Sequence, residues 1–88
     1  MKKESYIEKK CCEIAKQNGY VTRKLQYIAN NGAPDRIFFK KGHLFFVEFK
    51  KEDGTLSKLQ EVECEMLRLA GQEVYEIRDI EQFKGKLK

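Results

Sequence analysis

Hydrophobic residues near the start of the chain recur with the spacing of an α-helix. Residues 5–18 carry one apolar stripe, which a period of 3.6 residues places on a single face. The stripe consists of Ile7, Cys11, Ile14 and Ala15. Ser5 followed by Glu8 fits a capping box, and Gly19 is a typical helix-ending residue. The pattern therefore predicts an amphipathic helix over 5–18.

Two further helices are indicated in the second half of the chain. Ser57 followed by Gln60 matches a second capping box and begins a helix that runs to about Ala70, before Gly71. The stripe that we expect to face the core of the protein consists of Leu59, Val62, Met66 and Leu69. Asp79 is a suitable N-cap for a last short helix. Its inward residues are expected to be Ile80, Phe83 and Leu87.

Four segments have the composition and alternation of β-strands. They are residues 20–27, 35–40, 43–50 and 72–78. The second and third are separated by Lys41 and Gly42 alone, which predicts a hairpin with a two-residue turn. Five of the six Phe residues lie in this hairpin and alternate between its faces: Phe38, Phe39, Phe45, Phe46 and Phe49. Both faces must then be covered, so we place the hairpin in the middle of a sheet.

The predicted order of elements is αβββαβα, which indicates the α/β class with helices on both faces of a central sheet. The helix between the third and fourth strands suggests a crossover, right-handed if those strands are parallel. Eighty-eight residues suit a single domain over 1–88. A core this small gains from oligomerisation.

Composition excludes several classes of protein. Charged residues make up 36% of the chain and no apolar run approaches the ~20 residues of a membrane span. The first ten residues lack the apolar segment of a signal peptide. Three cysteines, two of them adjacent, and one His cannot build a usual zinc site, so we expect buried thiols in a cytoplasmic protein.

The net charge of +4 conceals an uneven distribution. Residues 59–82 hold seven acidic side chains and two basic ones, whereas residues 36–58 carry an excess of Lys and Arg. This distribution is compatible with a polyanion bound on one face, although charge alone does not decide between that and ordinary solvated surface.

The predicted hairpin brings chemistry-bearing residues together. With a turn at 41–42, Asp35 lies opposite Glu48, Lys50 shares their face, and Phe49 points to the other. Two carboxylates placed across a strand pair repel each other unless a cation lies between them. Mg²⁺ takes such oxygen ligands, and the backbone carbonyl of Phe49 is a candidate third ligand. The alternative is a salt-bridged strand end without catalytic chemistry.

A metal at this site would lower the pKa of a bound water and polarise a phosphodiester. Lys50 would orient that water or stabilise the charge of the transition state. The residues Gly32-Ala33-Pro34-Asp35, Glu48-Phe49-Lys50 and Gln60 resemble the motifs of the PD-(D/E)xK nuclease superfamily, and within it the VRR-NUC (virus-type replication-repair nuclease) domain. The resemblance implies a restriction-endonuclease-like core and covers nearly the whole chain.

The resemblance also implies roles for individual residues. Asp35 and Glu48 match the metal-binding acids, with Phe49 as the carbonyl ligand, and Lys50 matches the catalytic lysine. Gln60 matches a glutamine near the site. Glu8 matches the acid on the first helix that approaches the metal. Glu8 and Gln60 also occupy capping-box positions, so capping remains an alternative for both.

The implied activity is Mg²⁺- or Mn²⁺-dependent DNA endonuclease action on branched DNA such as four-way (Holliday) junctions, or on flaps or forks. Stand-alone viral and bacterial members of the family imply a homodimer, with neither a membrane nor an organic cofactor. The lysines expected to contact DNA phosphates are Lys24, Lys40, Lys41, Lys51 and Lys58. A non-catalytic module for double-stranded RNA or DNA is the alternative, since the order αβββα also occurs there; the predicted fourth strand argues against it.

Overall fold

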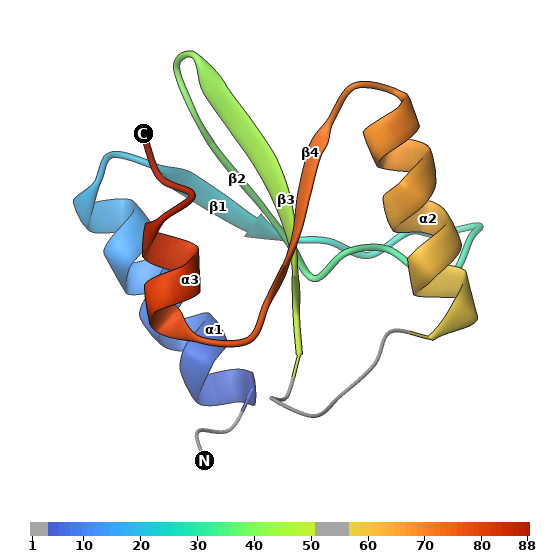
Figure 1. Ribbon diagram of the computed structural model, residues 1–88, viewed down its shortest axis with the longest axis horizontal. Coiled ribbons are helices and arrows are strands. Elements are labelled where there is room, and N and C mark those ends of the chain that lie inside the picture. The colour runs from blue at the N-terminus through green and yellow to red at the C-terminus, as the bar shows by residue number, and fades with distance from the viewer. Residues whose placement is uncertain (1–3, 51–56) are drawn as a thin grey trace.

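Four strands form one mixed sheet, and helices lie on both of its faces (Figure 1). The computed structural model describes residues 4–50 and 57–88. Its elements in chain order are α1 (Glu4–Gln17), β1 (Val21–Lys24), β2 (Arg36–Lys40), β3 (His43–Phe49), α2 (Lys58–Leu69), β4 (Glu73–Ile77) and α3 (Ile80–Lys84). The predicted order of elements and the α/β class are confirmed.

The strands lie side by side in chain order, so the hairpin β2–β3 occupies the middle of the sheet as expected. β1 and β2 are antiparallel, as are β2 and β3, whereas β4 is parallel to β3. Within the hairpin Lys40 pairs with His43 and Arg36 with Val47, which is the register predicted from a two-residue turn. Gly42 has φ +85° at this turn, a conformation that Gly adopts without a steric penalty.

The main core lies between the sheet and the helix pair α1 and α3, which appear together at the left of Figure 1. The rings of Phe38 and Phe45 stack at 5.3 Å, and Phe83 of α3 lies 5.1 Å from Phe38. Each fully buried side chain of this kind contributes about 1.5–3 kcal/mol. The three free cysteines are buried, as predicted. Cys11 and Cys12 belong to this core.

Helix α2 covers the opposite face, but it presents a different side from the one expected. Leu59, Val62, Met66 and Leu69 are 55%, 46%, 60% and 78% exposed. The helix instead turns Cys64 inward, with no exposed surface. The prediction of an inward apolar stripe was therefore wrong, because periodicity locates a stripe without saying which surface covers it.

The ends of the helices agree with the predicted caps at two of three positions. Ser57 and Gln60 form a capping box, and the Asp79 side chain accepts from the backbone N–H of Gln82. The box expected at Ser5 is wrong, because Ser5 already lies inside α1 and Glu8 bonds to residues of the sheet. The first strand is also shorter than expected and ends at Lys24.

No helix within residues 4–50 and 57–88 has the length and apolar character needed to cross a membrane.

Candidate functional site

Asp35 and Glu48 meet at one end of the central hairpin. The pairs of the β2–β3 ladder extend to Arg36 and Val47, so the next pair is Asp35 with Glu48. One carboxylate oxygen of Asp35, Oδ2, accepts the backbone N–H of Phe49 at 2.8 Å. The strand that carries Glu48 thus orients Asp35, and the two carboxyl groups share one face at the end of the sheet.

Glu48 is buried, with 2% of its surface exposed, and its Oε2 receives no hydrogen bond within the part of the chain that is described. Burial raises the pKa of Glu48 and the negative charge of neighbouring Asp35 acts in the same direction, so that this pKa lies at about 8. The charge of Lys50 acts against this shift, and that of Glu4 adds to it. A buried carboxylate with an unsatisfied oxygen favours a proton or a cation beside it.

Gln60 joins helix α2 to this carboxylate. Its side-chain Nε2 donates to Oε1 of Glu48 at 3.1 Å, while its Oε1 accepts the backbone N–H of Ser57 at 3.1 Å. One amide group therefore caps the helix and also contacts Glu48, while a part of Gln60 in catalysis stays a prediction. Through this contact Gln60 reaches Glu48, which lies 12 positions earlier in the chain.

The loop before β2 is shaped by one close approach. Gly32 has φ +94°, and a Cβ added there would lie 2.6 Å from the backbone oxygen of Leu59. Only glycine allows the loop to pass the first turn of α2 at this distance. Tyr27 of the same loop donates to Glu63 at 2.6 Å. These contacts hold Asp35, which follows the loop, beside the helix that supplies Gln60.

The residues of this site fit a divalent metal ion. Two adjacent acidic side chains, an unsatisfied oxygen on Glu48 and its raised pKa are the features that a hard cation compensates. Within residues 4–50 and 57–88, no cluster of three or more His, Cys, Asp and Glu side chains could hold a metal ion. Asp35 and Glu48 would thus act with water and substrate oxygens, as Mg²⁺ sites in proteins commonly do.

Phe49 is the last residue of β3, and Lys50 directly follows it. The charge of Lys50 lowers the pKa of Glu48, so its ammonium group is near enough to stabilise the carboxylate. Phe49 donates its N–H to Asp35 and buries its side chain on the opposite face, at 1% exposure. The carbonyl of Phe49 as a metal ligand stays a prediction.

Glu8 has different partners from those expected of a metal ligand. Its Oε2 accepts from Nε of Arg36 at 2.6 Å and from Nζ of Lys24 at 3.1 Å. Burial alone would raise the pKa of Glu8, but these two bonds outweigh burial and lower it. Glu8 is therefore paired with two cations. Its assignment to the metal stays a prediction that these contacts do not support.

Sequence reasoning missed Glu4 and Arg36. Glu4 lies one helical turn before Glu8 on α1, and its charge acts on Glu48. The spacing of four residues, which puts both acids on one side of the helix, was the available signal. The sequence gives no sign that Arg36, which follows Asp35, pairs with Glu8. Only the packing of α1 against the sheet brings the two residues together.

The predicted DNA-contacting lysines do not form one group. Lys24 is close to Glu8, and Lys58 is the first residue of α2, two residues before Gln60. Lys40 and Lys41 lie at the other end of β2 from Asp35, where Lys40 donates to the backbone carbonyls of Asn18 and Lys88. Lys51 lies outside the described residues.

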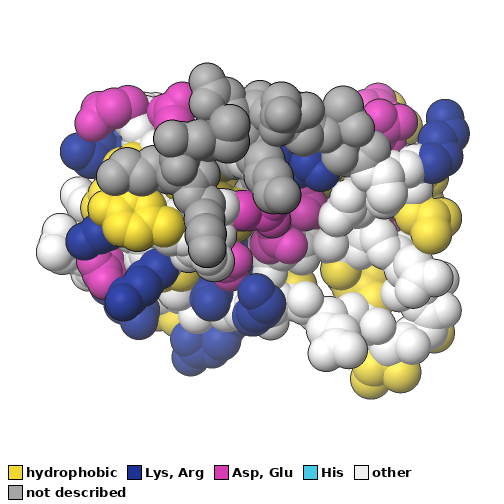
Figure 2. Space-filling view, turned by 90° about the horizontal axis from the view of Figure 1, so that it is seen from below, with side chains coloured by type: hydrophobic (Ala, Val, Ile, Leu, Met, Phe, Trp, Pro, Cys, Tyr) yellow, Lys and Arg dark blue, Asp and Glu magenta, His cyan; other side chains and the backbone are white. Residues whose placement is uncertain are grey.

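Figure 2 views the molecule from the lower side of Figure 1. Acidic side chains gather near the middle of this face, and Lys and Arg side chains lie directly beside them. Attractive and repulsive surfaces for phosphate are thus adjacent. A divalent metal ion at the acidic group would offset the negative charge of the carboxylates and so weaken their repulsion of phosphate.

Comparison with known proteins shows a similarity of the whole fold. One solved structure, described as a "VRR_NUC domain", matches with a TM-score of 0.88 and 30% sequence identity, over 97% of this chain and 94% of that chain. No protein-family model matches the sequence, and no curated protein does either. The similarity therefore extends over nearly the full length of both chains.

Proposed function

Because the chain belongs to the VRR-NUC family of nuclease domains, we propose that it is a divalent-metal-dependent DNA endonuclease acting on branched DNA. The observation that carries this proposal is the pairing of Asp35 with buried Glu48, whose unsatisfied oxygen and raised pKa favour a cation beside it. Charge compensation by a divalent ion is the simplest reason to keep two carboxylates together at a sheet end.

Asp35 and Glu48 would hold Mg²⁺ or Mn²⁺, with Glu4 as a candidate additional acid. When bound, the ion supplies a more acidic water and polarises the phosphodiester. The chain itself orients the ligands: the N–H of Phe49 positions Asp35, and the amide of Gln60 positions Glu48. Lys50 places a positive charge beside the reacting phosphate, where it stabilises the negative charge of the transition state.

A cleavage assay tests this function directly. Labelled duplex, flap, fork and four-way-junction DNA are incubated with the protein in Mg²⁺, Mn²⁺ or EDTA. We expect cleavage in either metal, none in EDTA, and the fastest reaction on a branched substrate. Tight binding of duplex RNA without cleavage of any DNA in Mn²⁺ would contradict the proposal and support a non-catalytic binding module.

We also propose that two copies act together through helix α2. Cutting both strands of a junction requires two active sites, and a two-fold dimer supplies them. The α2 stripe, defined as Leu59, Val62, Met66 and Leu69, leaves large apolar side chains in solvent. It offers on the order of 500 Å², against about 800 Å² that each partner contributes to a standard interface. The stripe would thus form the centre of such an interface.

The double variant Met66→Gln/Leu69→Gln should shift the protein from dimer to monomer, because it removes the two most exposed apolar groups of the α2 stripe. Light scattering coupled to size exclusion would report a fall from twice the 10.4 kDa chain mass to once that mass. Ile28→Gln is the matched control, since Ile28 is fully exposed outside the stripe. A wild-type protein that stays monomeric at all concentrations would rule out this interface.

A further inference from the structure

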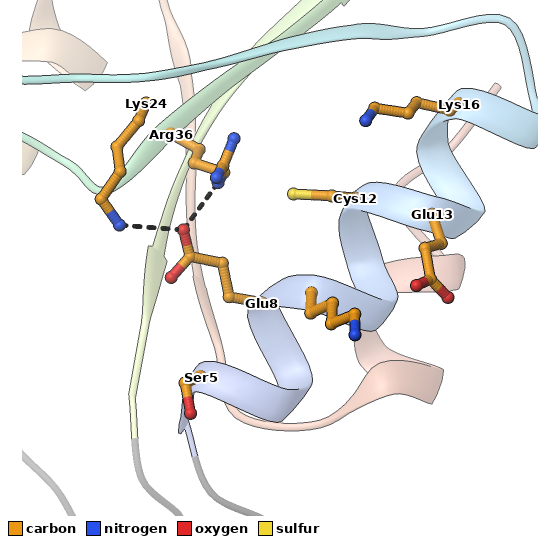
Figure 3. A pocket seen from close by; sticks show the side chains of 8 residues that line it. Ser5, Glu8, Cys12, Glu13, Lys16, Lys24 and Arg36 are labelled. Atoms are coloured by element: carbon orange, nitrogen blue, oxygen red, sulfur yellow. Dashed lines mark hydrogen bonds and ion pairs between the residues drawn. The ribbon is translucent and has the colours of Figure 1, made fainter.

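A pocket lies on the α1 side of the sheet, at the same end of the sheet as Asp35 and Glu48, and we propose that it binds a backbone phosphate of the nucleic-acid strand next to the phosphate being cleaved. This inference rests on the proposed nuclease function and deepens it. The pocket has a volume of about 400 Å³ and lies between α1, β1 and β2 (Figure 3). The residues that line it are Ser5, Glu8, Lys9, Cys12, Glu13, Lys16, Lys24 and Arg36.

The charge of this basic pocket favours an anion. Four of its side chains are cationic and two are anionic. Glu13 is paired at 3.5 Å with Lys10, which does not line the pocket. Lys9 and Lys16 pair with no acidic group of residues 4–50 and 57–88 in ion-pair range. The positive charge is therefore not neutralised from within the pocket, and a phosphodiester would neutralise it.

Glu8 organises the cations. A single oxygen of Glu8 accepts from both Nε of Arg36 and Nζ of Lys24, as the dashed lines of Figure 3 show. Arg36 is only 22% exposed at its side chain, so its guanidinium is held in place by packing as well as by this bond. Guanidinium has five N–H donors and Glu8 engages Nε, which leaves its terminal nitrogens for a second acceptor. Glu8 is thus a positioning residue of the basic pocket.

The basic pocket is correctly placed for a strand that enters the candidate site. Arg36 directly follows Asp35, and side chains alternate along a strand, so Arg36 faces α1 while Asp35 faces the other side. Both belong to the same end of the sheet. A nucleic-acid strand that crosses this end would therefore have one phosphate at the carboxylates and a neighbouring one at Arg36 and Lys24.

The test separates binding from cleavage. In a Glu48→Gln background with EDTA, fluorescence anisotropy measures the affinity for labelled branched DNA at several salt concentrations. Lys9→Ala and Lys16→Ala should each weaken binding about three- to tenfold and reduce the slope of log K against log salt by about 1. Lys84→Ala, an exposed α3 lysine paired with Glu81, removes the same charge and should change neither value.

Glu8→Gln distinguishes a positioning residue from a metal ligand. We expect the KM for DNA to change, with Mn²⁺ affinity measured by calorimetry unaltered. A loss of Mn²⁺ affinity would return Glu8 to the metal site and overturn its role in the basic pocket.

The results of these experiments distinguish a failure of the basic pocket from a failure of the proposed nuclease function. If wild-type protein cleaves DNA but Lys9→Ala and Lys16→Ala bind like Lys84→Ala, the basic pocket is rejected alone. If neither binding nor cleavage of DNA occurs, the proposed function fails and the basic pocket with it. Inorganic phosphate that binds more tightly than DNA in calorimetry would reject a nucleic-acid phosphate as the occupant.

Discussion

Replacing Lys50 by alanine should slow metal-dependent DNA cleavage by about 10²–10⁴-fold, the range expected when a positioned acid–base or electrostatic group is removed. Lys50 lies at the end of β3, and its charge acts on Glu48. Without it, the phosphate reacts next to two carboxylates with less compensating charge. The decrease should fall on kcat, because the interaction is strongest when negative charge develops in the transition state.

Asp35→Asn and Glu48→Gln should cause losses of similar size for another reason. Both substitutions keep the shape of the side chain but remove an anionic ligand, so the ion is held less tightly. A higher metal concentration should partly restore these two variants and should not restore Lys50→Ala. The rates are measured at saturating DNA over a series of Mn²⁺ concentrations.

Matched substitutions away from the site control for charge and folding. Lys84→Ala and Glu81→Gln alter exposed residues of α3 that pair with each other, and both variants should cleave like the wild type. Circular dichroism would verify that each site variant retains its fold. Metal-dependent cleavage that persists in Glu48→Gln would show that the acidic pair is not the active site.

The metal-free protein should lose stability as the pH rises from about 4.5 to about 8. Glu48 retains its proton to about pH 8 when folded, whereas its ordinary value is 4.5. Between these values the native state binds more protons than the unfolded state, so the free energy of unfolding falls with pH. The loss should be on the order of a few kcal/mol and complete above pH 8, where both states are ionised.

Thermal unfolding in EDTA between pH 5 and 8.5 measures this slope. Glu48→Gln should flatten it and raise the melting temperature at pH 8, because the buried charge is gone. Mn²⁺ should stabilise the wild type more at pH 8 than at pH 6, since the ion must displace the proton of Glu48. Glu81→Gln should keep the wild-type slope. A wild-type melting temperature independent of pH over this range would contradict the assigned burial of the Glu48 charge.

Local sequence signals predicted the fold because each depends on neighbouring residues alone. A two-residue gap determines the register of a hairpin, so the opposition of Asp35 and Glu48 followed from counting. The cap formed by Ser57 and Gln60 is equally local. By contrast, the strand predicted over 20–27 ends at Lys24, after which the chain leaves the sheet and forms the loop that contacts α2.

The side of α2 that packs on the sheet was beyond local signals. Its apolar stripe and its buried side differ, because burial depends on how the helix is rotated against β4. Arg68 contributes to that rotation by donating Nε and Nη2 to the backbone carbonyl of Val74. Periodicity alone placed the α2 stripe in the core. Its exposure in the structure suggests that a partner covers it.

The amino-acid order by itself determined the class of fold, the succession of elements and the meeting of Asp35, Glu48 and Lys50, because pleating and a short turn leave little freedom. Tertiary packing alone decided which charges act together. It brought Glu8 of α1 to Arg36 and Lys24 of the sheet, and the amide of Gln60 to Glu48. Such contacts join residues 12 to 28 positions apart, and their energies depend on burial and distance that no local pattern contains.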